Sequence, residues 1–227
     1  MKYYFAPMEG ITGPIHRKAF DACFPGVDKY FTAFIAPNQK GKFSAREKKD
    51  IDPENNRGIF LIPQIMTNDA GDFTVTALQL ESLGYKEVNL NLGCPSRTVV
   101  SKYRGSGFLA IPDKLERFLD DVFTDRDKKM PDMRISIKTR IGKDDPDEFE
   151  RLMEIYDRYP LEELIVHPRT QQDFYQGRPD MKAFGYAAEK GKSPVCYNGD
   201  ILTVGDLNRF TSAYPQIDKV MIGRGSL

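Results

Sequence analysis

Short apolar runs alternate with longer amphipathic segments along the whole of this chain. The pattern predicts eight strands, at residues 3–6, 29–36, 59–66, 87–92, 134–140, 163–167, 194–198 and 219–223. Apolar residues three or four apart predict intervening helices, most clearly at 70–83, 113–123, 147–159, 181–190 and 204–214. Continuous apolar runs such as 59–62 are typical of parallel strands buried on both faces. Eight such repeats favour an α/β fold of the closed (β/α)8 TIM-barrel type over an open sheet.

The chain length of 227 residues is compatible with one such barrel as a single domain. No apolar run approaches the roughly 20 residues of a membrane-spanning helix, and the first seven residues lack the apolar core of a signal peptide. The 33 basic and 33 acidic residues cancel, so net charge gives no general attraction to nucleic acid or anionic membrane. We expect a cytoplasmic monomer without a membrane segment. We also expect the polar stretch 41–49 to be a loop.

Three cysteines, Cys23, Cys94 and Cys196, are widely separated and show no Cys-x-x-Cys spacing. This argues against a disulfide framework and a structural zinc site, so no metal is expected. Cys23 and Cys196 have the simple interpretation of small buried hydrophobes. Cys94 instead lies between Gly93 and Pro95, on a turn that leaves a strand and presents the side chain. A thiol with a pKa near about 8.5 could act there as a proton donor or as a nucleophile, and the residues alone leave both roles open.

Polar residues gather where the predicted strands end, which is the end of a βα barrel that carries the chemistry. Lys138 and His167 each follow an apolar run and should face the barrel mouth, whereas His16 should be a partly buried ring in the first helix. A lysine in such a mouth is costly to bury without an anionic partner or an electron-rich ring. Gly223-Arg224-Gly225, together with Asn198-Gly199-Asp200, stands where many barrels bind phosphate.

These segments together resemble the tRNA-dihydrouridine synthases, flavin-dependent barrel enzymes that reduce uracil bases in tRNA. The most specific stretches are Ala6-Pro7-Met8-Glu9-Gly10-Ile11-Thr12, residues 89–96 with Arg104-Gly105-Ser106-Gly107 after them, and His167-Pro168-Arg169-Thr170. Lys138-Thr139-Arg140 and the two glycine-containing strand ends complete the pattern in the family's order. The similarity covers essentially the whole chain.

The resemblance implies an FMN cofactor with NADPH as the electron donor. Hydride would pass from FMN to C6 of the uracil, and Cys94 would protonate C5. Asn91, Arg140 and Arg169 are expected to hold the uracil edge and a nearby phosphate. The residues expected to bind FMN are Pro7, Met8, Glu9, Gln64, Lys138, His167, Asn198, Gly199, Asp200, Gly223 and Arg224.

The same resemblance makes tRNA the expected partner, with the target base turned out of its stack into the pocket. A local basic rim of Lys102, Arg104, Arg140, Arg169 and Arg178 is expected to help, despite the zero net charge. No closing helix is visible after the eighth predicted strand. We therefore expect residues 1–227 to be the FMN-binding catalytic barrel, truncated before the helical tRNA-binding domain that family members carry.

Two other functions remain compatible with the sequence. One is a flavin barrel that acts on a free pyrimidine or a dihydroorotate-like metabolite, in which the corresponding cysteine or serine is a base. The other is a non-catalytic RNA-binding barrel. Bound flavin would separate the second from the enzymes, and activity on free bases would separate the first.

Overall fold

The computed structural model describes residues 1–37 and 41–227 and forms a closed barrel of eight parallel strands in sequence order. The first and last strands pair, with Tyr3 opposite Val220 and Phe5 opposite Ile222, so the sheet has no open edge. The strands are β1 (Lys2–Phe5), β2 (Lys29–Ile35), β3 (Leu61–Ile65), β4 (Glu87–Leu92), β5 (Arg134–Arg140), β6 (Leu164–His167), β7 (Val195–Tyr197) and β8 (Lys219–Ile222). The predicted TIM barrel is therefore confirmed.

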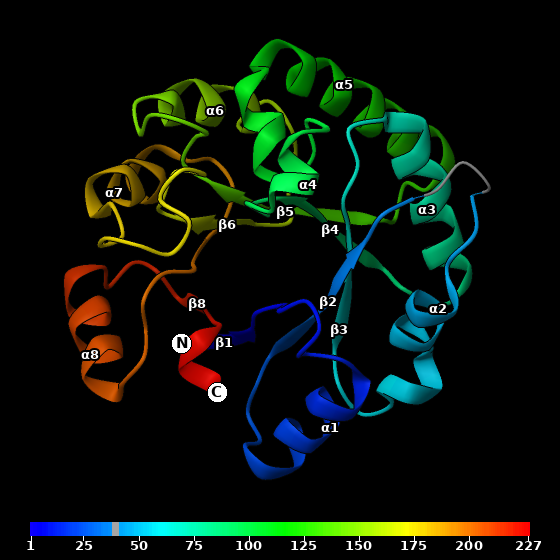
Figure 1. The fold of residues 1–227 in the computed structure, drawn as a ribbon, viewed down its shortest axis with the longest axis horizontal. Helices are drawn as coiled ribbons and strands as arrows, with labels where there is room; N and C mark the ends of the chain where they lie inside the picture. The colour runs from blue at the N-terminus through cyan, green and yellow to red at the C-terminus, as the bar shows by residue number, and fades with distance from the viewer. Residues whose placement is uncertain (38–40) are drawn as a thin grey trace.

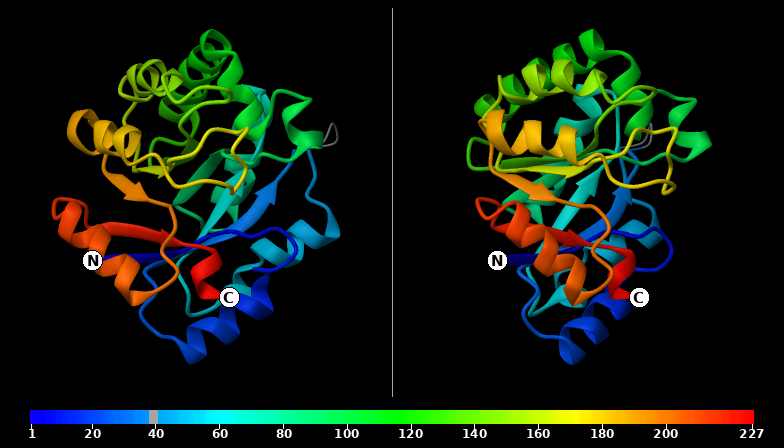
Figure 2. Two further views of the ribbon diagram at one scale, coloured as in Figure 1. Left: turned by 60° about the vertical axis from the view of Figure 1, so that its left-hand side comes forward. Right: turned by 90° about the vertical axis from the view of Figure 1, so that its left-hand side faces the viewer.

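Helices form a shell around these strands, which all run in one direction inside it (Figures 1 and 2). The α-helices are α1 (Pro14–Cys23), α2 (Ala45–Ile51), α3 (Ala70–Ser82), α4 (Arg97–Val100), α5 (Pro112–Lys129), α6 (Glu148–Tyr156), α7 (Met181–Lys190) and α8 (Val204–Ala213). Three 3₁₀ turns are η1 (Pro53–Asn56), η2 (Gly105–Ala110) and η3 (Arg224–Ser226). None of the described helices is long and apolar enough to cross a membrane.

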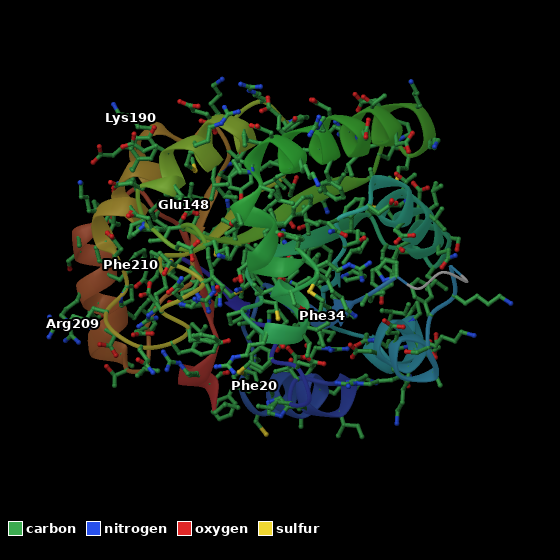
Figure 3. All side chains as sticks on the ribbon, turned by 45° about the horizontal axis from the view of Figure 1, so that its top comes forward. Phe20, Phe34, Glu148, Lys190, Arg209 and Phe210 are labelled. Carbon is green, nitrogen blue, oxygen red and sulfur yellow. The ribbon has the colours of Figure 1, made fainter. Side chains whose placement is uncertain are left out.

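The main hydrophobic core fills the layer between the barrel and its helices. In α8, Phe210 packs on Tyr197 of β7 with ring centroids 4.2 Å apart. Figure 3 shows Phe210 turned inward while its neighbour Arg209 lies at the outer edge of the molecule. A smaller cluster, which includes Phe31, Ile62 and Met221, comes from residues at alternate positions of the strands. The helices thus bury one face each, as their apolar spacing predicts.

A charged network closes the barrel at the amino-terminal ends of the strands. Lys29 Nζ lies 2.9 Å from carboxylate oxygens of both Glu87 and Glu163, and Tyr4 Oη donates to Glu163 at 2.8 Å. The Lys29, Glu87 and Glu163 side chains are at most 11% exposed. Burial lowers the pKa of Lys29, but the two carboxylates outweigh it and the net pKa is raised. We call Tyr4, Lys29, Glu87 and Glu163 the floor network.

The structure departs from the sequence predictions in three places. Arg140 and Arg169 are each 1% exposed, so the expected basic rim is wrong for these two residues. Residues 45–51 form helix α2, so the expected loop at 41–49 is wrong for its second half; Ser44 and Glu47 form a reciprocal capping box at its start. Cys23 is exposed rather than buried, because it occupies the last turn of α1 on the solvent side. Cys196 is buried as expected. His16 is partly buried, and its ring centroid lies 5.8 Å from that of Phe5.

Candidate active site

A pocket of about 550 Å³ opens at the carboxyl ends of the strands, and every strand or the loop that follows it contributes to its wall. Because parallel strands end at the same rim, residues distant in sequence meet there. Phe34 of β2, labelled in Figure 3, supplies part of the apolar wall. The predicted residues that line the pocket are Pro7, Met8, Glu9, Gln64, Asn91, Cys94, Lys138, Arg140, His167, Asn198, Gly199, Asp200, Gly223 and Arg224.

Cys94 lies on a turn that hydrogen bonds hold from both sides. The amide oxygen of Asn91 accepts from the backbone N–H groups of Gly93 and Cys94, each at 3.0 Å. Ser106 donates to the carbonyl of Cys94 from its backbone N–H at 3.1 Å and from its hydroxyl at 2.8 Å. Burial raises the pKa of the thiol above its ordinary value. The turn therefore presents a neutral thiol, which is able to donate a proton.

Asn91 belongs to a chain of amides that crosses three strands. Its Nδ2 donates to Gln64 at 2.7 Å, Gln64 Nε2 donates to Asn89 at 2.8 Å, and Asn89 donates to Ser136 at 2.9 Å. Both ends of the Asn91 amide thus contact protein groups. The structure shows Asn91 as the support of the Cys94 turn, and its contact with a uracil edge stays a prediction.

Lys138 places a half-buried ammonium in the pocket wall. Within residues 1–37 and 41–227, no carboxylate or hydrogen-bond acceptor contacts its Nζ atom. Burial, followed by the nearby Arg140 guanidinium, lowers the pKa of Lys138 to about 8. A nearby anion would stabilise the charged ammonium and raise the pKa of Lys138 again, so this part of the pocket wall is suited to a negatively charged ligand.

His167 is neutral in this setting and its tautomer can be inferred. Burial, together with the cations Arg140 and Lys138, lowers the pKa of His167 well below its ordinary value. Its Nε2 lies 3.1 Å from Arg169 Nη1. Because a guanidinium only donates, Nε2 must accept and Nδ1 carries the proton. His167 can therefore offer one N–H donor to a ligand without adding charge.

Arg169 is the predicted site residue that does not line the pocket. It is 1% exposed, and its guanidinium donates to both carboxylate oxygens of Asp200, at 3.0 and 2.6 Å. Arg224 reaches the same carboxylate at 2.7 Å. These hydrogen bonds, led by Arg169, hold the pKa of Asp200 below its usual range. Arg169 thus holds the carboxylate of Asp200 in place from behind the pocket wall. Direct contact between Arg169 and substrate stays a prediction.

Glycines let the loops after β7 and β8 approach closely. A Cβ at Gly199 would lie 2.0 Å from the Tyr197 hydroxyl oxygen, and a Cβ at Gly225 would lie 2.1 Å from the Ile201 carbonyl oxygen. Asn198 Nδ2 donates to the carbonyl of Met221 at 2.8 Å and joins the loop after β7 to strand β8. Arg224 is about half exposed beside them. This corner offers backbone N–H groups and a guanidinium to an anion such as phosphate.

The loop that follows β6 adds two aromatic residues to the site that were not among the predicted site residues. Phe174 and Tyr175 line the pocket, and the Tyr175 ring centroid lies 5.4 Å from the guanidinium carbons of both Arg140 and Arg224. The only available signal was a pair of adjacent aromatics in a polar segment. They extend the pocket wall above the strand ends with surfaces on which a flat ring can stack.

Comparison with known proteins identifies the family of this chain. Residues 4–227 match the family model described as dihydrouridine synthase. The chain belongs to the dihydrouridine synthase family.

Curated relatives agree with this dihydrouridine synthase assignment. The chain is 26% identical to tRNA-dihydrouridine synthase B of Pasteurella multocida, over 100% of this chain and 66% of that protein. It is 27% identical to a probable tRNA-dihydrouridine synthase of Staphylococcus aureus, over 98% of this chain and 67% of that protein. The chain thus spans about two thirds of the length of the curated relatives it matches.

Solved structures support the fold of this dihydrouridine synthase family member. The old yellow enzyme homologue from Zymomonas mobilis superposes with a TM-score of 0.65 at 11% identity, covering 98% of this chain and 84% of that one. The 3-hexulose-6-phosphate synthase from Salmonella typhimurium superposes with a TM-score of 0.57 at 13% identity, covering 99% and 90%. Proteins of such different names share the barrel, so this likeness shows the fold alone.

Proposed function

We propose that this chain binds FMN and reduces uridine in tRNA to 5,6-dihydrouridine, with NADPH as the electron donor. The observation that carries the proposal is the meeting of a neutral Cys94 thiol and an unpaired Lys138 ammonium in one pocket. Family membership and relatives named tRNA-dihydrouridine synthase support the substrate class. Cofactor, donor and mechanism are parts of the proposal.

The pocket fits FMN by the chemistry of its wall. Lys138 offers a cation where the reduced flavin ring carries negative charge, and His167 offers one neutral N–H donor. Gly199, Gly223 and Arg224 form the anion-binding corner expected to hold the phosphate. Pro7, Met8, Glu9, Gln64, Asn198 and Asp200 complete the expected contacts along the ring and ribityl chain. No group of three or more metal-binding side chains occurs in the described ranges 1–37 and 41–227.

The chemistry that bound FMN supplies is hydride transfer, from NADPH onto the flavin and then to C6 of uracil. Cys94 donates the proton to C5 and is left as a thiolate. Burial keeps the thiol protonated before reaction, and Arg140 lies near enough to lower the energy of the thiolate afterwards. Asn91 holds the turn so that the sulfur keeps its place while the substrate enters.

The proposed substrate must enter the pocket as a single base. A uridine inside a folded RNA has to leave its stack first, as in other enzymes that act on bases. Phe174 and Tyr175 then offer apolar surface at the mouth. The expected helical RNA-binding domain stays a prediction.

Two measurements on purified protein test the proposal. Bound flavin should give absorbance bands near about 370 and 450 nm, and NADPH should bleach the second band. With tRNA that lacks the modification, the protein should form dihydrouridine while leaving free uracil and dihydroorotate unchanged. Turnover of the free compounds instead would favour the free-pyrimidine enzyme. A protein that cannot be loaded with flavin would favour a non-catalytic RNA-binding barrel.

Once the contribution of Lys138 is removed by Lys138→Met, the rate of uridine reduction should stay level from about pH 6 to about pH 8 and fall only at higher pH. The donor must hold its proton, and burial raises the pKa of Cys94 above the ordinary value for a thiol. Single-turnover oxidation of pre-reduced protein by tRNA across this range measures the profile. Loss of the Lys138 proton, near pH 8, adds a decline that Lys138→Met should remove. A remaining midpoint below pH 8 in that variant would contradict a neutral thiol donor.

Replacing Lys138 with Met should slow reduction of the flavin by NADPH about 100-fold, because the neutral side chain no longer stabilises the developing negative charge. Stopped-flow absorbance measures this rate, and flavin fluorescence measures the affinity for FMN separately. Lys182→Met changes an exposed lysine of α7 and serves as the control. An unchanged reduction rate in Lys138→Met would remove Lys138 from the proposed mechanism.

A further inference from the structure

The segment 97–104, which follows the Cys94 turn, concentrates positive charge. It contains Arg97, Lys102 and Arg104, and the wider stretch 88–112 holds no aspartate or glutamate although the whole chain is neutral. Arg97 and Lys102 are exposed. Across the described residues, neither side chain makes a hydrogen bond or an ion pair. Some cations elsewhere on the surface do have such partners, as Arg151 has in Glu116.

Tyr103 stands at the tip of this segment with its ring in solvent. It is 53% exposed, and its ring and hydroxyl have no partner in the described parts of the chain. Its backbone is left-handed, with φ of 51°, a conformation that is unfavourable for a bulky side chain. Backbone hydrogen bonds from Tyr103 to Val100 and from Arg104 to Val99 impose it. The fold thus keeps a strained aromatic exposed between two cations.

Residues 97–104, which we call the tip, are also held by hydrogen bonds from Asn68 in the loop after β3. Asn68 Nδ2 donates to the carbonyl of Lys102 at 3.0 Å, and its amide oxygen accepts from Arg104 Nε at 3.4 Å. Arg104 is therefore held, and the side chains left free are those of Arg97, Lys102 and Tyr103. In both views of Figure 2 this green segment projects from the main body of the barrel.

The tip is joined tightly to the Cys94 turn. Gly105 directly follows the tip, and a Cβ there would lie 2.8 Å from the Cys94 carbonyl oxygen. Ser106 makes its two hydrogen bonds to the same carbonyl. A molecule held at Tyr103 would thus keep a defined position relative to the thiol.

The free groups fit RNA better than an acidic protein surface. Two unpaired cations lie in the same short segment as a flat ring with an exposed face, and this combination binds backbone phosphates while a base stacks on the ring. We propose that the tip 97–104 docks the RNA strand next to the target uridine, with Tyr103 stacked on a neighbouring base and Arg97 and Lys102 on phosphates. This inference rests on the proposed tRNA substrate and extends it beyond the pocket.

Tyr103→Asn tests the stacking contact, because asparagine tolerates a left-handed backbone and the variant should keep the fold. We expect its Kd for unmodified tRNA to rise about tenfold, within the range for losing one base–aromatic stack. The KM for tRNA should rise in parallel, while flavin reduction by NADPH is unchanged. Tyr103→Phe keeps the ring and should retain wild-type affinity.

Arg97→Gln with Lys102→Gln tests the phosphate contacts. The slope of log Kd against log salt should become shallower by about 1.4 to 1.8, which is the loss of two phosphate contacts. Phe24→Ala and Lys192→Gln change an exposed aromatic and an exposed lysine at the opposite end of the barrel and should leave Kd unchanged.

Unchanged Kd, KM and salt slope in the tip variants of an active protein would overturn this inference alone. An equal loss in the two control variants would overturn it as well, since the effect would not be local. A wild-type protein that forms no dihydrouridine would instead overturn the proposed function, whatever the tip variants do. Tyr103-dependent self-association with unaltered tRNA binding would show that the tip binds a second copy rather than RNA.

Discussion

Replacing Cys94 with Ala should lower the rate of uridine reduction about 10²- to 10⁴-fold, the usual range for losing a general acid. Reduction of the flavin by NADPH should persist, because the residues expected at the cofactor are unchanged. The Cys94 turn itself should survive, since its hydrogen bonds to Asn91 and Ser106 involve backbone atoms of residue 94. Dihydrouridine formed in a single turnover and flavin absorbance measured in the same sample separate the two half-reactions.

Cys23→Ala is the matched control, because Cys23 is an exposed thiol in the last turn of α1. It should retain full activity. Cys94→Ser keeps the size of the side chain but offers a far weaker acid, so it should also be slow. If Cys94→Ala reduced uridine at the wild-type rate, the proton would come from another group and the assignment of Cys94 would be wrong.

Replacing Lys29 with Met should lower the free energy of unfolding by about 3–5 kcal/mol, the cost of breaking a buried ion pair from one side. Glu87 and Glu163 would then face each other in the barrel floor without their shared cation. Chemical denaturation followed by circular dichroism measures the loss. Lys86→Met, at an exposed neighbouring lysine, should cost little.

The pH dependence of the Lys29→Met variant gives a second check on the floor network. Burial already raises the pKa of Glu87, and removing Lys29 takes away the charge that opposes this shift. A carboxyl whose pKa is raised on folding binds more protons in the native state, so the variant should regain stability as pH falls. Adding Glu87→Gln and Glu163→Gln should restore part of the loss at neutral pH. A loss that is independent of pH would indicate a packing defect instead.

Local pattern was sufficient to predict the barrel. Strand and helix periodicities are properties of neighbouring residues, and the eight predicted strands overlap β1 to β8. Helix α2 was missed because Ala45–Ile51 is short and mostly charged, and its capping box is a stronger signal than its apolar spacing. Cys23 was misjudged because residue type alone does not say which side of a helix faces solvent.

The placement of candidate site residues at one mouth also followed from the sequence. Strands that run parallel must end at the same rim, so polar residues such as Cys94, Lys138 and His167 had to converge once eight repeats were recognised. Residue type then predicted a cation and a thiol near one ligand. Their protonation states could not be predicted, because desolvation depends on the surrounding atoms of other strands.

Only the closed tertiary structure decided how these residues pair. Arg169 does not line the pocket because its guanidinium pairs with the carboxylate of Asp200, 31 residues later, from behind the pocket wall. In the sequence, Tyr4, Lys29 and Glu163 are ordinary residues in or next to predicted strands. Closure of the barrel brings Glu163 into contact with Lys29, 134 residues away, and with Tyr4, 159 residues away. The sequence by itself thus determined the barrel and the end at which the site lies, since both follow from local periodicity and strand direction. Pairing depends on register and closure, which set non-local distances that no local pattern contains.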